Sequence, residues 1–121
     1  MLRRLGLSKV TRAGRSLLER RVARSLTVEV DGFRLSGDVR HRGHLYRFAG
    51  DGYEQLNRAL FSDSVGRGMV VLDIGAHLGL YSLIAASRVG KTGTVYAFEP
   101  DPRTFPHLVG NIKGNRLEER V

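Results

Sequence analysis

The order of apolar and polar positions divides this chain into an alternating segment, two segments of helical period and a longer apolar segment that glycines interrupt. Residues 27–36 alternate, and Asp31 and Gly32 at their centre suit a two-residue turn with positive φ. These features predict a β-hairpin. The cross-strand pairs that such a turn sets are Val30 with Phe33, Val28 with Leu35, and Glu29 with Arg34.

Residues 51–62 have the period of a helix. Asp51, followed three residues later by Glu54, resembles a capping box at its start. The apolar face predicted for this helix consists of Tyr53, Leu56, Leu60 and Phe61. Between the hairpin and this helix, the short run 44–48 (HLYRF) is expected to form another strand.

The longer apolar segment covers residues 69–99. Its first part, 69–73, is apolar without alternation, which is typical of a parallel strand buried on both faces. Residues 78–89 predict a well-covered helix that Gly90 ends in the left-handed conformation, and 94–99 predict a second strand. A right-handed crossover through the helix makes the two strands parallel and adjacent.

A third helix is expected after the second strand. With Thr104 as its N-cap, Pro106 falls in the first turn, where proline is tolerated. The apolar side of this helix is formed by Phe105, Leu108, Val109 and Ile112. From the residues alone, Asn111 and Asn115 are expected at an exposed helix end.

The turn between strand and helix carries the candidate chemistry. Gly75 lacks a Cβ, so the backbone can approach a ligand closely there, and Gly79 opens the helix. Asp73 and Glu99 end the two strands, and open α/β sheets bind ligands at the carboxyl ends of their strands. The carboxylate of Glu99 can accept hydrogen bonds from the cis-diol of a ribose.

The spacing favours S-adenosylmethionine over NAD. A dinucleotide site has the pattern G-x-G-x-x-G, whereas this turn is Asp73-x-Gly75-x-x-x-Gly79, with His77 where a glycine is required. S-adenosylmethionine has no pyrophosphate, and its ammonium group benefits from an acid near the first strand.

Charge is spread unevenly along the 121 residues. The formal net charge is +8, but residues 1–25 alone hold eight Lys or Arg and one Glu. This segment is predicted to be a solvated basic leader. The alternatives are a helix lying on an anionic membrane surface, a transit peptide and a nucleic-acid contact. Because the remainder of the chain is nearly neutral, we expect that nucleic acid is not a partner.

Composition excludes some classes of site and segment. The chain has no cysteine, which excludes disulfides and thiolate metal sites, and no apolar run approaches the ~20 residues of a membrane span. A cytoplasmic location is expected, with peripheral membrane contact as the alternative. His41 and His44 form an H-x-x-H pair without a third ligand nearby in sequence, so we expect two exposed polar residues and no metal site.

Three sequence segments together resemble the FkbM-type methyltransferase family: VVLDIGAHLGLYSLIAA, VYAFEPDP and LVGNIKGN, within residues 69–115. The resemblance implies a class I, S-adenosylmethionine-dependent O-methyltransferase with a Rossmann-like α/β fold. Carried over by position, the methionine end of the cofactor is lined by Asp73, Gly75, Ala76, His77 and Gly79. Glu99 holds the ribose hydroxyls, and Pro100 and Asp101 lie near the adenosine. His77 replaces the family's usual asparagine, for which we expect a local polar role.

The expected organisation has three parts: a basic amphipathic leader (1–26), a hairpin with a lead-in helix (27–68), and the amino-terminal part of a cofactor-binding domain (69–121). We expect a fragment of a longer methyltransferase, without an assignable catalytic base, whose acceptor is a hydroxyl on a small molecule or glycan such as a sugar, glycolipid or polyketide. The alternatives are a non-catalytic remnant or interaction module, an NAD(P)-dependent oxidoreductase, and a protein that binds RNA through its basic tail.

Overall fold

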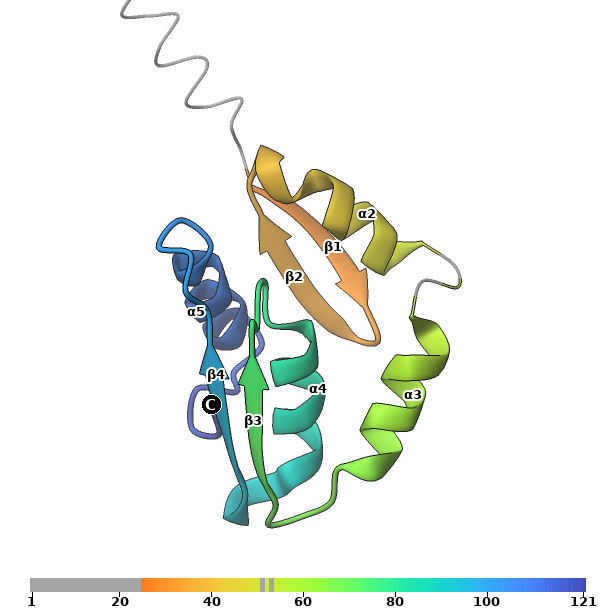
Figure 1. The fold of residues 1–121 in the computed structure, drawn as a ribbon, viewed down its shortest axis with the longest axis vertical. Helices are drawn as coiled ribbons and strands as arrows, with labels where there is room; N and C mark the ends of the chain where they lie inside the picture. The colour runs from red at the N-terminus through yellow and green to blue at the C-terminus, as the bar shows by residue number, and fades with distance from the viewer. Residues whose placement is uncertain (1–24, 51, 53) are drawn as a thin grey trace, which may run out of the picture.

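The computed structural model describes residues 25–50, 52 and 54–121, so the expectations for the basic leader lie outside the described residues. The elements, in chain order, are β1 (Leu26–Val30), β2 (Phe33–Gly37), the 3-10 helix η2 (Val39–His41), α2 (Arg42–Ala49), α3 (Gln55–Ser64), β3 (Val70–Ile74), α4 (Leu80–Val89), the 3-10 helix η3 (Gly90–Thr92), β4 (Thr94–Phe98) and α5 (Phe105–Gly114) (Figure 1). Within the described part of the chain, every helix is too short or too polar to cross a bilayer.

The hairpin of β1 and β2 is confirmed, with the predicted cross-strand pairs. Asp31 and Gly32 have φ of 51° and 83°, as a turn with positive φ at both central residues requires. Val30 and Leu35 enter the core from one face of the hairpin. Helix α2 covers this face (Figure 1).

The strand expected at 44–48 is wrong, because these residues lie in α2. Leu45 and Phe48 are three positions apart, so a helix places both on the side that packs against the hairpin. Leu45 is buried, whereas the intervening Tyr46 is exposed. A helix, unlike a strand, therefore buries the apolar residues of this segment on one side.

Helix α3 is confirmed, and Phe61 of its predicted face packs against the core, but the prediction is wrong for Leu56 and Leu60. Leu56 and Leu60 are 71% and 60% exposed, and Arg58 is buried instead. The Nε of Arg58 lies 2.7 Å from Oδ2 of Asp31 in the hairpin turn, so an ion pair determines which side of α3 faces inward. Phe61 packs edge-on against Tyr81 of α4.

The start of α3 also differs from the expected capping box. Asp51 and Tyr53 lie outside the described residues. Glu54 is the N-cap and has a left-handed backbone with φ of 49°, and its side chain makes no capping hydrogen bond. Instead, its carboxylate accepts a hydrogen bond of 3.0 Å from the Tyr81 hydroxyl.

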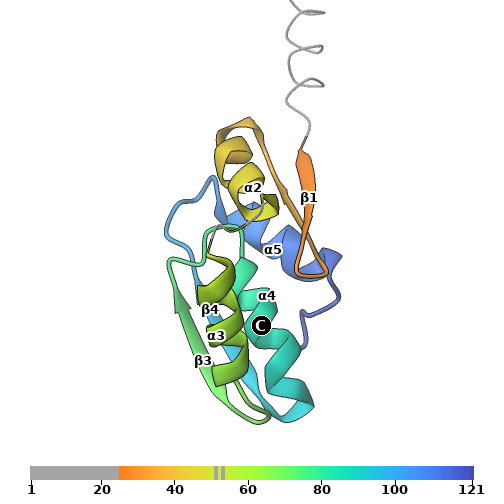
Figure 2. The ribbon, with the colours of Figure 1, turned by 90° about the vertical axis from the view of Figure 1, so that its right-hand side faces the viewer.

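Strands β3 and β4 pair in parallel, as predicted, with Val70 opposite Thr94 and Ile74 opposite Phe98. Figures 1 and 2 show α4 against one face of this sheet, where Val95 is buried. The expectation of burial on both faces is wrong for the described residues. Side chains on the other face are each more than half exposed: Val70, Leu72, Ile74, Tyr96 and Phe98.

Helix α4 begins at Leu80, two residues later than predicted, because Gly79 is its N-cap with φ of 90°. A Cβ on Gly79 would lie 2.6 Å from Cδ1 of Leu108, so the glycine allows α5 to pack tightly on the start of α4. Gly90 ends α4, as predicted, and has a positive φ of 69°, but its ψ of −167° is not that of the predicted left-handed conformation.

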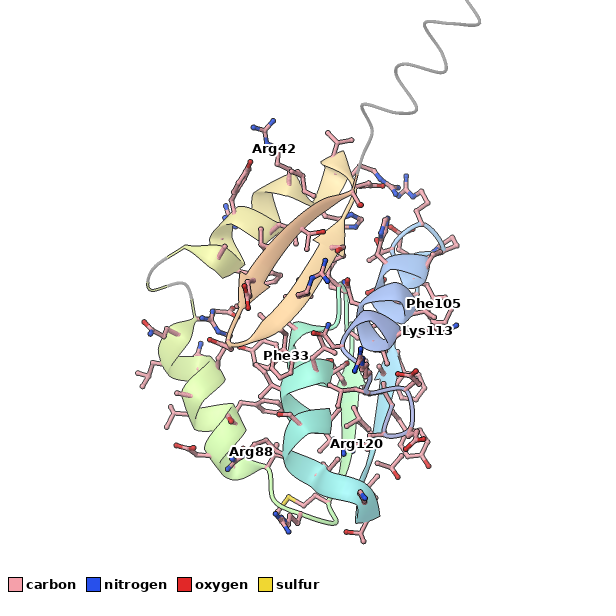
Figure 3. All side chains as sticks on the ribbon, turned by 180° about the vertical axis from the view of Figure 1, so that it is seen from behind. Phe33, Arg42, Arg88, Phe105, Lys113 and Arg120 are labelled. Atoms are coloured by element: carbon pink, nitrogen blue, oxygen red, sulfur yellow. The ribbon has the colours of Figure 1, made fainter. Side chains whose placement is uncertain are left out.

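Helix α5 begins after Thr104, as predicted, but the expectation for its two asparagines is wrong. Asn111 is 3% exposed, and both Asn111 and Asn115 bind the backbone of β2. They fasten the hairpin to α5. Figure 3 shows Phe33, at the start of β2, between the hairpin and α4.

Candidate functional site

The turn between β3 and α4 is fixed to the end of β4 by backbone hydrogen bonds. The N–H groups of Gly75 and Ala76 both donate to the carbonyl of Phe98, over 2.8 and 2.9 Å. Gly75 has φ of 84°, and a Cβ built on it would have no heavy atom within 4 Å. The backbone of Gly75 therefore borders open space, as an approaching ligand requires.

Glu99 lies directly against this turn. Its Oε2 accepts the N–H of His77 over 2.8 Å, and its Oε1 accepts the N–H of Asp101 over the same distance. These two bonds hold the carboxylate in one orientation. Since each carboxylate oxygen has a second acceptor site, both remain able to accept a hydrogen bond from a diol.

Asp73 lies inside β3, one residue before its end, and is half-buried. Its Oδ2 accepts a hydrogen bond of 2.5 Å from the hydroxyl of Ser82, which is fully buried in α4. Sequence reasoning missed Ser82. The available signal was a polar residue in an otherwise apolar stretch of helix, three positions after Gly79.

A pocket of about 540 Å³ adjoins the turn and the end of β4. Its lining consists of Ile74, Gly75, Ala97, Phe98, Glu99, Pro100 and Phe105. The apolar and aromatic walls suit a flat heterocycle such as adenine, and Glu99 is placed for the attached ribose. Of the predicted site residues, this pocket brings together Gly75, Glu99 and Pro100. Figure 3 shows Phe105 at the edge of α5.

The imidazole of His77 packs against two other histidine rings. The ring centroid of His77 lies 4.7 Å from that of His44 and 5.2 Å from that of His41. Burial, followed by the neighbouring imidazoles, lowers the pKa of His77, and the Glu99 carboxylate opposes this shift. The part of His77 that faces Glu99 is its backbone N–H, and the φ of 52° suits a residue such as His or Asn.

The expectation that His41 is exposed is wrong, since it is only 4% exposed. Its Nε2 lies 3.2 Å from the Thr104 hydroxyl, which donates to Oδ2 of Asp101 over 3.0 Å. Burial is the main cause that lowers the pKa of His41, and the nearby Asp38 carboxylate opposes it. Through Asp101, this chain of hydrogen bonds reaches Glu99.

Asp101 shapes the loop that follows Glu99. Its Oδ1 accepts the backbone N–H of Arg103 over 3.0 Å. This bond, together with one from the Arg103 side chain, lowers the pKa of Asp101 to about 2. Its N–H supports Glu99, whereas its carboxylate stabilises the loop itself. Pro100, between the two acids, is exposed.

A strand–helix–strand unit with a glycine bend and an acid after its second strand is the arrangement of a class I methyltransferase. The particular family is shown by residues 47–121, which match the model of the TRM5/TYW2 methyltransferase domain. The chain therefore belongs to the TRM5/TYW2 family. The predicted cofactor is confirmed, because the methyltransferases of this family depend on S-adenosylmethionine. No curated protein sequence matches the chain.

Solved structures share this fold. A transferase from Pyrococcus horikoshii is 26% identical with a TM-score of 0.63, and the match covers 81% of this chain and 34% of that one. P. horikoshii TYW2 in complex with MeSAdo is 28% identical with a TM-score of 0.60, covering 81% and 34%. Methanocaldococcus jannaschii Trm5 in complex with adenosine is 25% identical with a TM-score of 0.59, covering 79% and 27%. The chain thus spans about a third of the length of these structures.

The family match corrects two predictions. The FkbM-type assignment is not supported, because the matching model is TRM5/TYW2. The prediction of a small-molecule or glycan acceptor without nucleic acid is wrong, because the TRM5/TYW2 family acts on tRNA. The motifs within residues 69–115 indicate the cofactor, and none of their residues is assigned to an acceptor from the sequence.

Proposed function

We propose that this chain supplies the cofactor-binding half-site of a tRNA-modifying, S-adenosylmethionine-dependent methyltransferase. The observation that carries the proposal is the Glu99 carboxylate, which two backbone N–H groups hold beside the glycine bend and the apolar pocket. A ribose recognised by Glu99 leaves the adenine for the pocket and the methionine end for the bend.

Three of the predicted site residues, Asp73, Gly75 and Glu99, have a specific part in this proposal. Glu99 accepts hydrogen bonds from the two ribose hydroxyls, and Phe98 and Phe105 pack on the adenine. The backbone at Gly75 gives the ligand room. Asp73, oriented by Ser82, attracts the cationic ammonium group. S-adenosylmethionine supplies the sulfonium-bound methyl group that is transferred. We assign no general base among the described residues.

The proposal of tRNA as acceptor rests on the family and on charge. The TRM5/TYW2 family acts on tRNA, and two solved relatives are Trm5 and TYW2 proteins. The basic segment 1–25, with eight Lys or Arg and one Glu, attracts a polyanion at low ionic strength. A basic protein of this kind binds RNA with an affinity that falls as salt rises.

Calorimetry with S-adenosylhomocysteine and with NADH tests the cofactor site. We expect binding of S-adenosylhomocysteine and none of NADH. Glu99→Gln should weaken binding at least about tenfold, because a hydrogen bond to a charged group contributes roughly 1.5–3 kcal/mol. Asp63→Asn, which neutralises an exposed carboxylate on α3, is the matched control and should bind like the wild type. Equal weakening by both variants would contradict the proposal.

Filter binding of an unmodified tRNA transcript tests the acceptor. We expect the logarithm of the association constant to fall linearly with the logarithm of the salt concentration. A single-stranded DNA of equal length is the control for charge alone. If the chain binds both with the same affinity at every salt concentration, the tRNA assignment is refuted, while the cofactor assignment stands on its own test.

A further inference from the structure

The rings of all four histidines of the chain form one cluster, in which each ring contacts at least one other. They come from separate segments: His41 from η2, His44 from α2, His77 from the turn after β3, and His107 from α5. The ring of His107 lies 5.0 Å from that of His41. The proposed function uses the backbone of His77 and leaves the imidazoles without a role.

One subset of this cluster has the composition of a metal site. Asp38, His41 and His107 each offer a ligand atom, and these three atoms lie within 4.8 Å of one another. Nδ1 of His41 is 2.9 Å from Oδ1 of Asp38, and Nε2 of His107 is 3.6 Å from its Oδ2. We infer that Asp38, His41 and His107 form a binding site for a divalent first-row transition ion of the Zn²⁺ class.

The dimensions of the cluster suit such an ion. A cation at the centre of three atoms with these separations would lie at most about 2.8 Å from each, against about 2.0–2.2 Å for a bound Zn²⁺. Closing of the side chains by about 0.7 Å completes the site. Two imidazoles and one carboxylate favour Zn²⁺, Co²⁺ or Ni²⁺ over Mg²⁺ and Ca²⁺, which prefer oxygen ligands.

The negative charge of Asp38 favours a bound cation, and it also attracts the guanidinium of Arg40, which competes with that cation. The Asp38 carboxylate is ionised, because the Arg40 guanidinium beside it holds its pKa well below the usual range. Nε of Arg40 lies 2.8 Å from Oδ2 of Asp38, so an entering cation displaces this guanidinium. The side chain of Arg40 is 44% exposed and can move into water.

The site would join two segments that are distant in sequence. Asp38 and His41 lie between the hairpin and α2, and His107 lies in the first turns of α5. His41 also reaches Glu99 through Thr104 and Asp101. A bound ion therefore stabilises the packing of α5 on the hairpin. The inference stands on these residues alone and does not depend on the proposed function.

Titration of the tag-free, full chain with Zn²⁺ and with Co²⁺ tests the site. We expect one ion per chain, an absorption band of liganded Co²⁺ and a higher melting temperature. His107→Ala should weaken Zn²⁺ binding at least about tenfold. His44→Ala removes an imidazole of the same cluster that lies outside the ligand set, and it should leave the affinity within about twofold of the wild type.

Arg40→Ala provides a test that loss of folding cannot imitate. Removing the competing guanidinium should tighten Zn²⁺ binding several-fold. The inference is overturned if the wild type binds neither ion, or if His44→Ala weakens binding as much as His107→Ala. If His107→Ala fails to fold, Arg40→Ala decides: tighter binding supports the site, and unchanged binding refutes it.

Discussion

The two asparagines of α5 offer a matched test of how the hairpin is held to the cofactor-binding part. Asn111 accepts the N–H of Ser36 over 2.8 Å and donates to its carbonyl over 3.0 Å. One helical turn later, Asn115 makes the same pair of bonds with Arg34, over 2.9 and 2.8 Å. The two asparagines thus make the same pair of hydrogen bonds with β2, but Asn111 is buried and Asn115 is only partly buried.

The expected costs follow from this difference. Each asparagine makes a third bond of 2.8 Å: Asn111 to the carbonyl of Leu78, a residue that is 1% exposed, and Asn115 to the carbonyl of Asn111. Asn111→Ala leaves the Leu78 carbonyl without this bond, whereas in Asn115→Ala the Asn111 carbonyl still accepts the backbone N–H of residue 115. A buried polar group left without a partner costs about 1–3 kcal/mol, so we expect Asn111→Ala to lower the free energy of unfolding by about 2–4 kcal/mol. The backbone of exposed Arg34 can bind water instead, so Asn115→Ala should cost at most about 1 kcal/mol.

Urea denaturation followed by circular dichroism measures both variants. A difference of about 2 kcal/mol corresponds to a shift of about 1 M in the urea midpoint between them. The slope of the transition should be the same in both variants. Equal midpoints, or a lower midpoint for Asn115→Ala, would refute the view that the buried asparagine is the main link between hairpin and α5.

Three further predictions follow from the site. Gly79→Ala should lower the melting temperature more than Gly75→Ala does. Both substitutions strain a backbone with positive φ, but only Gly79→Ala places a methyl group against α5. Equal melting temperatures of the two variants would contradict this. Ser82→Ala should cost about 1–3 kcal/mol in urea denaturation, because it removes the hydroxyl that binds Asp73, and an unchanged midpoint would argue against that bond. The pKa of Asp101 is lowered from 3.8 to about 2, so the contribution of this carboxylate to stability is present above pH 3.8 and is lost as the pH falls toward 2. In acid titration, Asp101→Asn should therefore lose less stability than the wild type over this pH range. An unchanged acid transition would refute the assignment.

Local signals in the sequence predicted the turns and helix ends, which depend on the backbone conformation of a few neighbouring residues. The turn at Asp31 and Gly32 and the end of α4 at Gly90 have the positive φ that these residue types were expected to supply. Helix α5 begins after Thr104, which leaves its proline in the first turn, as predicted. Tertiary packing decided the rest. Arg58 is buried in α3 because Asp31, distant in sequence, supplies its partner.

The candidate site was predictable in part for the same reason. Asp73, Gly75 and Glu99 follow from strand ends and a glycine bend, whose geometry is local. The buried position of His41 and the links made by Asn111 depend on α5 and the hairpin meeting in space, which no spacing in the sequence reveals. The sequence motifs did not indicate the tRNA on which the family acts, because they belong to the cofactor half.

The most direct test of the central claim follows the backbone amide resonances of the chain during titration with S-adenosylhomocysteine. The proposed site predicts the largest shifts at Gly75, His77 and Asp101, whose N–H groups lie at the glycine bend or bind Glu99. Gly32, in the hairpin turn, should be unaffected. Shifts that are absent at the bend, or as large at Gly32 as at Gly75, would contradict the assignment of the cofactor site.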